Sequence, residues 1–485
     1  MSDQKYKPTI GLEIHAELKT ATKMFCNSKN DPDEEHPNVN ICPVCTGHPG
    51  TLPVINKEAV RHVLKVGVAV SGELADFTEF DRKNYFYPDI PKGYQISQYK
   101  YPLVKGGTLN NVAITRIHLE EDTATSLHVA DPEQSEGKGN YSLVDFNRAG
   151  VPLMELVTEP VINSAKQAVD FARELQLLLR YLGASDANME KGEMRVEANI
   201  SVSDSDVFGT KVEVKNLNSF RSVERAIAYE LLRQIELLEA REKVVQETRG
   251  WDEGKQETYS QRMKEESQDY RYFPDPDLPK LMLSEIPEFA SDALRKLMPE
   301  LPWERRARYQ KLGMETSKSE FKMNPDHIEM FLSDERFGKL FDETMFLQPG
   351  AYGIIANFIA TDVAGLVSKY GDKGLKNITP KGLEVVVRNY VERNLSSRGA
   401  KDAIEEVFVK GGDLSLVCKK YFQQSGEEEL KKVVEKIIAE NEKVVSDYKG
   451  GKESALQFLV GQGMKATKGS ANPEVLREIL RKLVQ

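Results

Sequence analysis

The sequence contains few cysteines and no long apolar run. Four cysteines in 485 residues argue against the disulfide framework of a small secreted protein. No segment approaches the roughly 20 apolar residues that a membrane-spanning helix requires, and the N-terminal Met-Ser-Asp-Gln-Lys lacks the apolar core of a signal peptide. We therefore expect a protein of the cytoplasm that does not associate with membranes.

A basic excess and the common catalytic motifs are also missing. The net charge is −10, so a nucleic-acid partner would have to dock on a local basic patch. P-loop, H-E-x-x-H and G-x-S-x-G motifs are absent, which leaves P-loop, zincin and α/β-hydrolase folds without support. The 40% apolar and 29% charged content is typical of a folded protein, long enough here for two to four domains.

Strands with one polar face are the main feature of the first 290 residues. In 9–18, the apolar residues alternate with Glu13, His15 and Glu17, which share one face. Similar patterns predict strands at 112–121, 142–147, 194–202 and 211–216, and helical spacing predicts helices at 164–182 and 222–239. The Pro-rich segment 269–279 predicts a fixed loop without regular structure.

The later strands carry comparable polar sets, which are His118, Glu120 and Asp122; Asp145 and Asn147; Arg195, Glu197, Asn199 and Ser201; and Lys211, Glu213 and Lys215. Any single set could be the solvated side of an antiparallel sheet. Together they mix short Asp, Asn and Ser side chains with Glu, His, Lys and Arg. That mixture favours a cleft that binds metal and phosphate.

From about residue 290 the pattern becomes helical. Helices are predicted at 288–312, 335–346, 353–369, 381–393, 400–410, 427–446, 452–460 and 474–484. The segment 461–471, rich in glycine, is predicted to be a flexible turn that carries Lys465 and Lys468. It could dock a phosphodiester backbone, or it could be an ordinary solvated loop.

The cysteines give a partial metal signal. Cys42 and Cys45 form a C-x-x-C on a turn, and Cys26 lies upstream. Structural zinc usually takes four ligands, so His36, His48 or an acid would have to complete the site, and both zinc and no metal stay open. Cys418 lies far away and is predicted to be a small core residue.

With these residues in view, the chain resembles, from end to end, the B-subunit family of bacterial glutamyl/aspartyl-tRNA amidotransferases. The motifs that carry the resemblance include Gly11-Leu-Glu-Ile-His15, Cys42-Pro-Val-Cys-Thr-Gly-His-Pro-Gly50, Arg82-Lys-Asn-Tyr-Phe-Tyr-Pro-Asp89, Lys92-Gly-Tyr-Gln-Ile-Ser-Gln98, His118-Leu-Glu-Glu-Asp122, Asp145-Phe-Asn-Arg-Ala-Gly-Val-Pro-Leu-Met-Glu155, Lys215-Asn-Leu-Asn-Ser-Phe220 and Asp269-Tyr-Arg-Tyr-Phe-Pro274.

The resemblance implies an α+β fold with three parts. These are a mixed α/β cradle with a largely antiparallel sheet at 1–290, a helical domain at 291–405 and a small, tRNA-binding helical tail at 406–485. It also implies an enzyme that uses ATP and Mg²⁺ to phosphorylate the side-chain carboxylate of Glu-tRNA(Gln) or Asp-tRNA(Asn). Ammonia from a partner amidase, the A-subunit, then displaces phosphate, and a small C-subunit completes the heterotrimer.

The same resemblance implies roles for individual residues. Glu13, His15 and Glu121 are expected to bind Mg²⁺, with Glu120 and Glu197 beside them. The expected phosphate-binding cations are Lys211, Lys215, Arg148 and Arg195. Catalysis is thus expected from Glu13, His15, Glu120, Glu121, Glu197, Lys211 and Lys215, and Zn²⁺ at Cys26, Cys42 and Cys45 is an open second metal.

Three departures from the family pattern stand beside these expectations. Zinc-bearing members have paired cysteines where this chain has Cys26-Asn-Ser28. The common acidic pair before Gly192 is Glu190-Lys191 here, so no metal role is assigned to Lys191. Glu197 stands where many members have a shorter aspartate.

One alternative function is that of a non-catalytic, tRNA-binding scaffold in the same complex. Another is the archaeal relative specific for Gln-tRNA, but it carries an inserted domain for which this chain has no spare segment.

Overall fold

The computed structural model describes residues 5–129, 141–263, 270–314, 323–422, 427–467, 471 and 473–484. The chain divides into two compact units, Met1–Pro302 and Trp303–Gln485. The predicted α+β class is confirmed, whereas the predicted boundaries near 290 and 405 stay predictions. Among the helices in the described ranges, none has both the length and the apolar character needed to cross a bilayer.

A large, mainly antiparallel sheet forms the centre of the first unit. Its described strands lie in the order β15 (Glu257–Met263), β14 (Glu247–Asp252), β13 (Val212–Leu217), β12 (Met194–Ser203), β1 (Lys7–Glu17), β11 (Pro152–Thr158), β8 (Val112–Glu121), β6 (Val104–Lys105) and β2 (Glu73–Leu74), and β7 (Thr108–Leu109) pairs with β8. Strands β13 and β14 pair in parallel. The predicted strands in this sheet are therefore confirmed to within two residues. The strand predicted at 142–147 is β10 (Tyr141–Asp145), which pairs with β9 (Thr125–Val129) in a separate hairpin.

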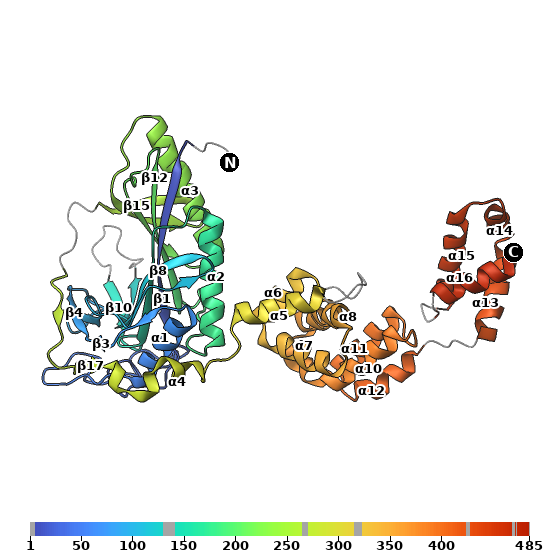
Figure 1. Cartoon of the computed structure of the whole chain (residues 1–485), viewed down its shortest axis with the longest axis horizontal. Coiled ribbons are helices and arrows are strands. Elements are labelled where there is room, and N and C mark those ends of the chain that lie inside the picture. Colours follow the sequence, from blue (N-terminus) through green and yellow to red (C-terminus); the bar gives the residue numbers. More distant parts are fainter. Residues whose placement is uncertain are drawn as a thin grey trace. The chain divides into compact units, whose positions relative to one another are not determined.

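Helices cover the apolar face of this sheet. The predicted helices are confirmed as α2 (Ala165–Tyr181), which contacts β1, and α3 (Phe220–Glu239), which contacts β12. Serine side chains cap both N-termini, Ser164 and Ser219. Ile10, Leu12 and Ile14 of β1 are fully buried on this side. Figure 1 shows α2 and α3 together on one side of the strands, so the polar residues that alternate with these apolar ones face the other side.

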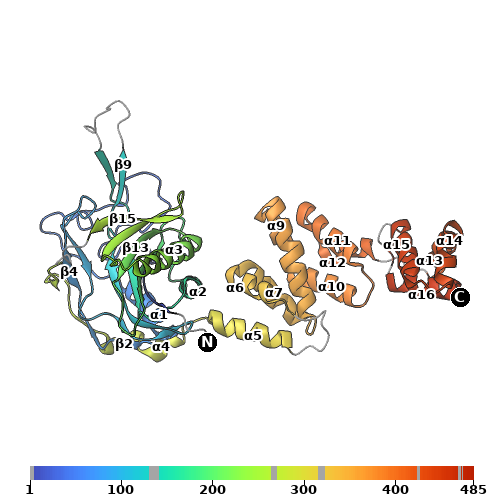
Figure 2. The same cartoon turned by 90° about the horizontal axis from the view of Figure 1, so that it is seen from above.

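A small sheet and a short helical layer complete the first unit. Strands β4 (Asp81–Asn84), β5 (Tyr94–Ser97) and β16 (Phe273–Pro274) form the small sheet, and β5 contacts β8. Figures 1 and 2 both place β4 on the other side of the large sheet from α2 and α3. Helices α1 (Lys57–Ala69) and α4 (Ser291–Arg295) pack together. The segment 269–279 was expected to have no regular structure. This is wrong at Phe273 and Pro274, which form β16 because they pair with the edge of β4. Asp269 lies outside the described residues.

The second unit is helical where the structure describes it. Its first group contains α5 (Pro302–Met314), α6 (Pro325–Ser333), α7 (Glu335–Leu347), α8 (Tyr352–Asn357), the π-helical η4 (Phe358–Val363), α9 (Ala364–Tyr370), η5 (Asp372–Asn377), α10 (Pro380–Val391), α11 (Ser397–Lys410), α12 (Leu414–Val417) and η6 (Cys418–Tyr421). The prediction of one helix at 288–312 is wrong, since Pro299 and Pro302 separate α4 from α5.

The last four helices, α13 (Glu427–Glu440), α14 (Glu442–Lys449), α15 (Glu453–Ala466) and α16 (Pro473–Val484), share a core of their own that includes Val434, Leu459 and Leu480. The flexible turn predicted from residue 461 is wrong up to Ala466, because α15 continues through both glycines. A side chain at Gly463 would meet Leu476 of α16 at 3.0 Å, so close packing outweighs the low helix propensity of glycine. Lys468 lies outside the described residues.

Candidate active site

The polar face of the large sheet brings the predicted acidic and imidazole groups together. Antiparallel pairing aligns His15 of β1 with one neighbour on each adjacent strand. The next strand, β8, extends the row, which reads Arg195, His15, Glu155 and His118. Because side chains two residues apart share a face, Glu13 and Glu120 lie beside this row.

His15 stands at the centre of three carboxylates. Its Nε2 lies 3.8 Å from Glu13 Oε1, 3.6 Å from Glu120 Oε1 and 3.4 Å from Glu155 Oε2. Burial opposes the charged imidazolium, but the hydrogen bond to Glu155 and the negative charges around the ring outweigh it and raise the pKa of His15 to about 9. Burial and the charge of Glu155 raise the pKa of Glu13.

Glu155 joins this group to a second one. Its Oε2 lies 3.4 Å from His118 Nε2, and Arg116 donates to its Oε1 at 3.3 Å. Burial opposes ionisation of Glu155, yet His118 and His15 hold the pKa of its carboxyl well below the usual range. The sequence assigned no role to Glu155, and the available signal was a single acid within the apolar strand Pro-Leu-Met-Glu-Leu-Val-Thr.

These two groups fit a divalent cation. The ligand atoms of Glu13, His15 and Glu155 lie within 4.8 Å of one another, as do those of His118, Glu120 and Glu155. Three carboxylates around one imidazole leave an excess of negative charge even when the ring is protonated. Carboxylate oxygens with few other ligands are the donor set that Mg²⁺ takes in phosphate-transferring sites.

The structure places Glu121, the third predicted Mg²⁺ ligand, away from these groups. Its carboxylate accepts hydrogen bonds from Lys92 Nζ at 2.6 Å and from the backbone N–H of Ile96 at 2.9 Å. Both partners belong to the small sheet or its border, since Ile96 lies in β5 and Lys92 lies two residues before that strand. Glu121 therefore links the two sheets, whereas the adjacent Glu120 faces His15.

The predicted cations occupy different positions on the same face. Lys215 Nζ donates to Glu197 Oε2 at 2.6 Å and lies 3.4 Å from Glu213 Oε1. Burial opposes its charge, but the charges of Glu197 and Glu213 raise the pKa of Lys215. Lys211 is exposed and directly precedes β13, so the structure does not bring it into this group.

The two predicted arginines meet at Asp122. Arg195 donates to Asp122 Oδ2 at 2.7 Å, and Arg148 Nε lies 3.8 Å from the same oxygen while it donates to the carbonyl of Thr123. Burial and the charge of Asp122 raise the pKa of Glu17, the third polar residue of β1, to about 8. This second charged group thus lies one step along β1 from His15.

Lys83 is a further cation that the sequence analysis did not select. Burial opposes its charge, but Glu120 and Glu155 are among the groups that raise its pKa, so it adds positive charge to the carboxylate groups. Its Nζ also lies 5.0 Å from the ring centre of Tyr270 and 6.0 Å from that of Tyr85. Lys83 lies on β4, and no local pattern indicates that this strand meets the polar face.

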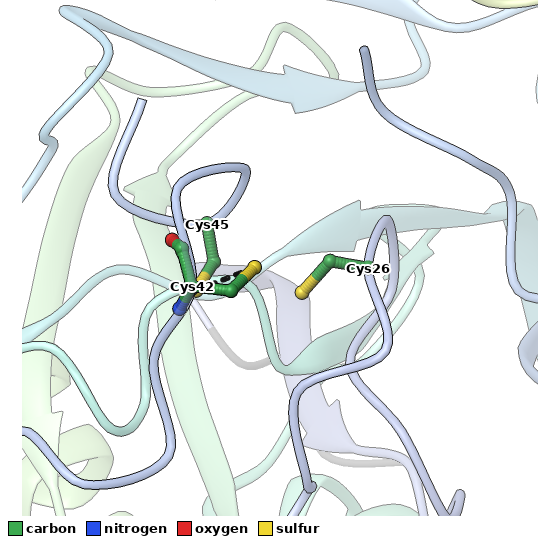
Figure 3. A group of neighbouring side chains, drawn as sticks. All are labelled: Cys26, Cys42 and Cys45. Carbon is green, nitrogen blue, oxygen red and sulfur yellow. Dashed lines mark hydrogen bonds between the residues drawn. The ribbon is translucent and has the colours of Figure 1, made fainter. Parts of the chain in front are cut away.

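The cysteine cluster lies elsewhere in the first unit. Figure 3 shows the Cys26 sulfur directed toward the Cys42–Cys45 pair, and all three sulfurs lie within 4.8 Å of one another. The hydrogen bond from Cys26, aided by the charge of Lys23, lowers the pKa of Cys45 to about 4 against the opposing effect of burial. Cys418 is buried in the second unit, as predicted.

Comparisons with known proteins match almost the whole chain to one family of amidotransferase subunits. A family model described as the GatB/GatE catalytic domain matches residues 8–287, and one described as the GatB domain matches residues 340–484. The B-subunit of the aspartyl/glutamyl-tRNA(Asn/Gln) amidotransferase of Gloeothece citriformis is 40% identical, covering 99% of this chain and 98% of the relative. The protein of the same description from Thermotoga petrophila is 41% identical, covering 99% of each chain.

Proposed function

The chain belongs to the amidotransferase B-subunit family that carries the GatB/GatE catalytic domain, and from this premise we propose that it catalyses the ATP-dependent step of tRNA transamidation. The proposed substrates are Glu-tRNA(Gln), Asp-tRNA(Asn) or both. The side-chain carboxylate attached to the tRNA is phosphorylated, and ammonia then displaces phosphate to give the amide. The resemblance identified from the sequence is confirmed; the reaction steps are the proposal.

The reaction needs a charged and ordered site because a carboxylate is a poor electrophile. Phosphorylation supplies a leaving group, and the enzyme must balance charge that develops on the transferring phosphoryl group. The observation that carries the proposal is the polar face itself. It combines two carboxylate–imidazole groups that share Glu155 with the cations Lys215, Arg195 and Lys83, within five neighbouring strands of the large sheet and the adjoining small sheet.

We assign the residues by their positions on that face. Glu13, His15 and Glu155 would hold Mg²⁺, with Glu120 and His118 as the neighbouring set. The ion, when bound, would neutralise phosphate oxygens of ATP. Lys215 and Arg195 would orient those phosphates, and Asp122 would hold Arg195 in place through their 2.7 Å hydrogen bond. Glu121 would align the small sheet through Lys92, because its carboxylate already has two donors.

The family also implies an assembly. We propose that the chain acts in the cytoplasm in a complex with an amidase that releases ammonia and with a small third protein. The helices α13 to α16 would bind the tRNA. They form a core of their own, and α16 carries Arg477, Arg481 and Lys482, which offer charge to a phosphodiester backbone.

The kinase assignment is tested with Glu13→Ala and His15→Ala in the assembled complex. Transfer of labelled γ-phosphate to misacylated tRNA and formation of amidated tRNA are both measured, together with tRNA affinity. We expect both activities to fall by at least about 100-fold, the loss that follows when a residue needed for charge stabilisation is removed, while tRNA affinity stays. His36→Ala, which removes an exposed ring, is the matched control. Intact phosphorylation in both variants would favour the scaffold function instead.

A second experiment tests the tail. Truncation after Phe422 preserves α11, whereas a cut near residue 405 would divide that helix. We expect the truncated chain to bind tRNA more weakly, with a shallower dependence on salt because phosphate contacts are lost, and to retain ATP hydrolysis that does not depend on tRNA. An unchanged tRNA affinity would show that the tail is not the docking element.

A further inference from the structure

Tyr99 presents an open aromatic face at the border of the small sheet. It follows the last residue of β5 by two positions and is 65% exposed. Its ring stacks on that of Tyr272, with centroids 4.5 Å apart and planes inclined by 13°. In the ranges that the structure describes, no other ring contacts Tyr99, so its second face is available to a flat ligand. A single exposed tyrosine is ordinary, but this one ends a row of rings that leads to the candidate active site.

Tyr272 and Tyr270 connect this open ring to the carboxylates of the site. Their ring centroids lie 6.1 Å apart in an edge-on contact, and Lys83 Nζ lies 5.0 Å from the centre of the Tyr270 ring. Burial raises the pKa of Tyr272 to about 12, and the charges of Glu120 and Glu155 add to the increase. Tyr272 therefore lies close enough to sense both carboxylates, while its ring supports the exposed one.

The backbone holds the two stacked rings in a fixed orientation. Arg271 has a φ of 45°, a left-handed conformation that is uncommon for residues other than glycine. Asn84 secures this turn, since its side chain donates to the carbonyl of Arg271 and its backbone N–H to that of Tyr270, each at 2.9 Å. On the other side, the backbone N–H of Tyr99 donates to Asp81 Oδ2 at 3.0 Å. A strained residue held in this way is typical of a binding site, and fixed rings lose little freedom when a ligand stacks on them.

The exposure of Tyr99 favours a base at the end of a strand over the base of a free nucleotide. Pockets for small molecules enclose most of the ligand surface, whereas an exposed ring leaves one side of its ligand in solvent. Single strands of nucleic acid are bound on open aromatic platforms of this kind, where unpaired bases stack one by one. The 3′ end of an aminoacylated tRNA is such a strand, and its last nucleotide carries the amino acid that must reach the site.

We propose that the stacked pair of Tyr99 and Tyr272 binds the unpaired terminal base of the aminoacylated tRNA, on the outer face of Tyr99. The amino acid on the same nucleotide is thereby directed along the row of rings toward Glu120 and Glu155. This inference rests on the proposed function, because it takes its ligand from the proposed substrate. The platform recognises the base by its flat face, so it orients the 3′ end and does not read which base is there.

The test uses the assembled complex and an aminoacylated tRNA with a fluorescent base analogue at its 3′-terminal position. Stacking on Tyr99 is expected to quench the fluorescence when the tRNA binds in the absence of ATP, and Tyr99→Ala to abolish the quenching. In transamidation, Tyr99→Ala should lower kcat/KM for the tRNA by about 5–150-fold, the contribution of one stacked base, and leave KM for ATP unchanged. Tyr99→Phe keeps the ring and should behave as the wild type. The matched control is Tyr141→Ala, which removes a 54% exposed tyrosine from β10 and should change neither readout.

A tRNA whose terminal nucleotide lacks its base identifies the partner of the ring. The wild type should lose the same factor in kcat/KM with this tRNA, and Tyr99→Ala should lose nothing more, because the two changes remove one interaction. The proposal is overturned if the two losses multiply, if the quenching persists in Tyr99→Ala, or if that variant raises KM for ATP and leaves the tRNA parameters unchanged. The fluorescence is read without ATP, so quenching that depends on Tyr99 would stand even if Glu13→Ala left phosphorylation intact. The two proposals therefore fail separately.

Discussion

Replacement of Glu155 by glutamine is predicted to discharge His15 near neutral pH. Glu155 is 5% exposed and contacts both imidazoles of the site, with Nε2 to Oε2 distances of 3.4 Å in each case. Glutamine has nearly the same shape but no charge. The variant therefore removes the attraction that keeps the buried imidazolium of His15 protonated, without opening a cavity.

The size of the effect follows from the pKa of His15. Folding of the metal-free chain raises this pKa from 6.5 to about 9, which corresponds to about 3 kcal/mol between the two protonation states. A pKa that is raised on folding contributes stability below pH 6.5, and this contribution disappears as the pH rises through 9. Loss of one opposite charge at this distance lowers such a pKa by about 1–3 pH units, so the variant should lose most of this pH dependence.

Nuclear magnetic resonance of the chain labelled at histidine gives the direct measurement. The sequence has seven histidines, and His15→Gln identifies the relevant signal. Urea unfolding at pH 6.5 and 9.5 then compares the stability lost by the wild type and by Glu155→Gln, with His36→Gln as the control for an exposed histidine. A wild-type His15 signal that titrates at or below pH 6.5 without metal would refute the reasoning.

Three further predictions concern the metal, the small sheet and the tail. Mg²⁺ must compete with the proton on His15, so its apparent affinity should rise by up to about tenfold per pH unit below pH 9; equal affinities at pH 7 and 8 by calorimetry would contradict this. Asp275→Asn should lower the free energy of unfolding by about 2–3 kcal/mol, because the buried carboxylate accepts from Arg82 Nε at 2.8 Å. The side chain of Asp277, which also pairs with Arg82, is 37% exposed. Asp277→Asn should therefore lower the free energy of unfolding by less than about 1 kcal/mol. Leu480→Ala in the tail core should cost about 2–5 kcal/mol in urea unfolding, and a smaller loss would mean that the tail core is loosely packed.

Local alternation was sufficient to predict four strands of the large sheet, which are β1, β8, β12 and β13, but it did not predict β11, β14 or β15. A strand with one polar and one apolar face repeats every two residues, and β1 and β12 follow that period throughout their central parts. The order of the strands is a different matter, because it depends on pairs far apart in the sequence. That β11 lies between β1 and β8 could not be read from any local pattern.

The residues that the sequence analysis missed all depend on such distant pairs. Glu155 lies in a strand that is buried on both faces, so its neighbours give no alternation to interpret. Lys83 reaches the site from the small sheet. The wrong prediction of a turn from residue 461 has the same origin. The two glycines favour a turn when only the local sequence is considered, whereas in the structure Gly463 packs against Leu476 of α16, a contact that the local sequence does not show.

The central position of β1 explains why one strand carries so much of the site. Side chains two residues apart on a strand lie about 7 Å from each other, and β1 has a paired strand on both sides. Glu13 therefore meets the group around Lys215 and Glu197, His15 meets the shared Glu155, and Glu17 meets the group around Asp122. A slip of one residue in the pairing of β1 would replace all three polar groups by Leu12, Ile14 and Ala16. It would also expose the apolar face, so the hydrophobic burial that stabilises the core also fixes the spacing of the side chains proposed to bind metal and phosphate.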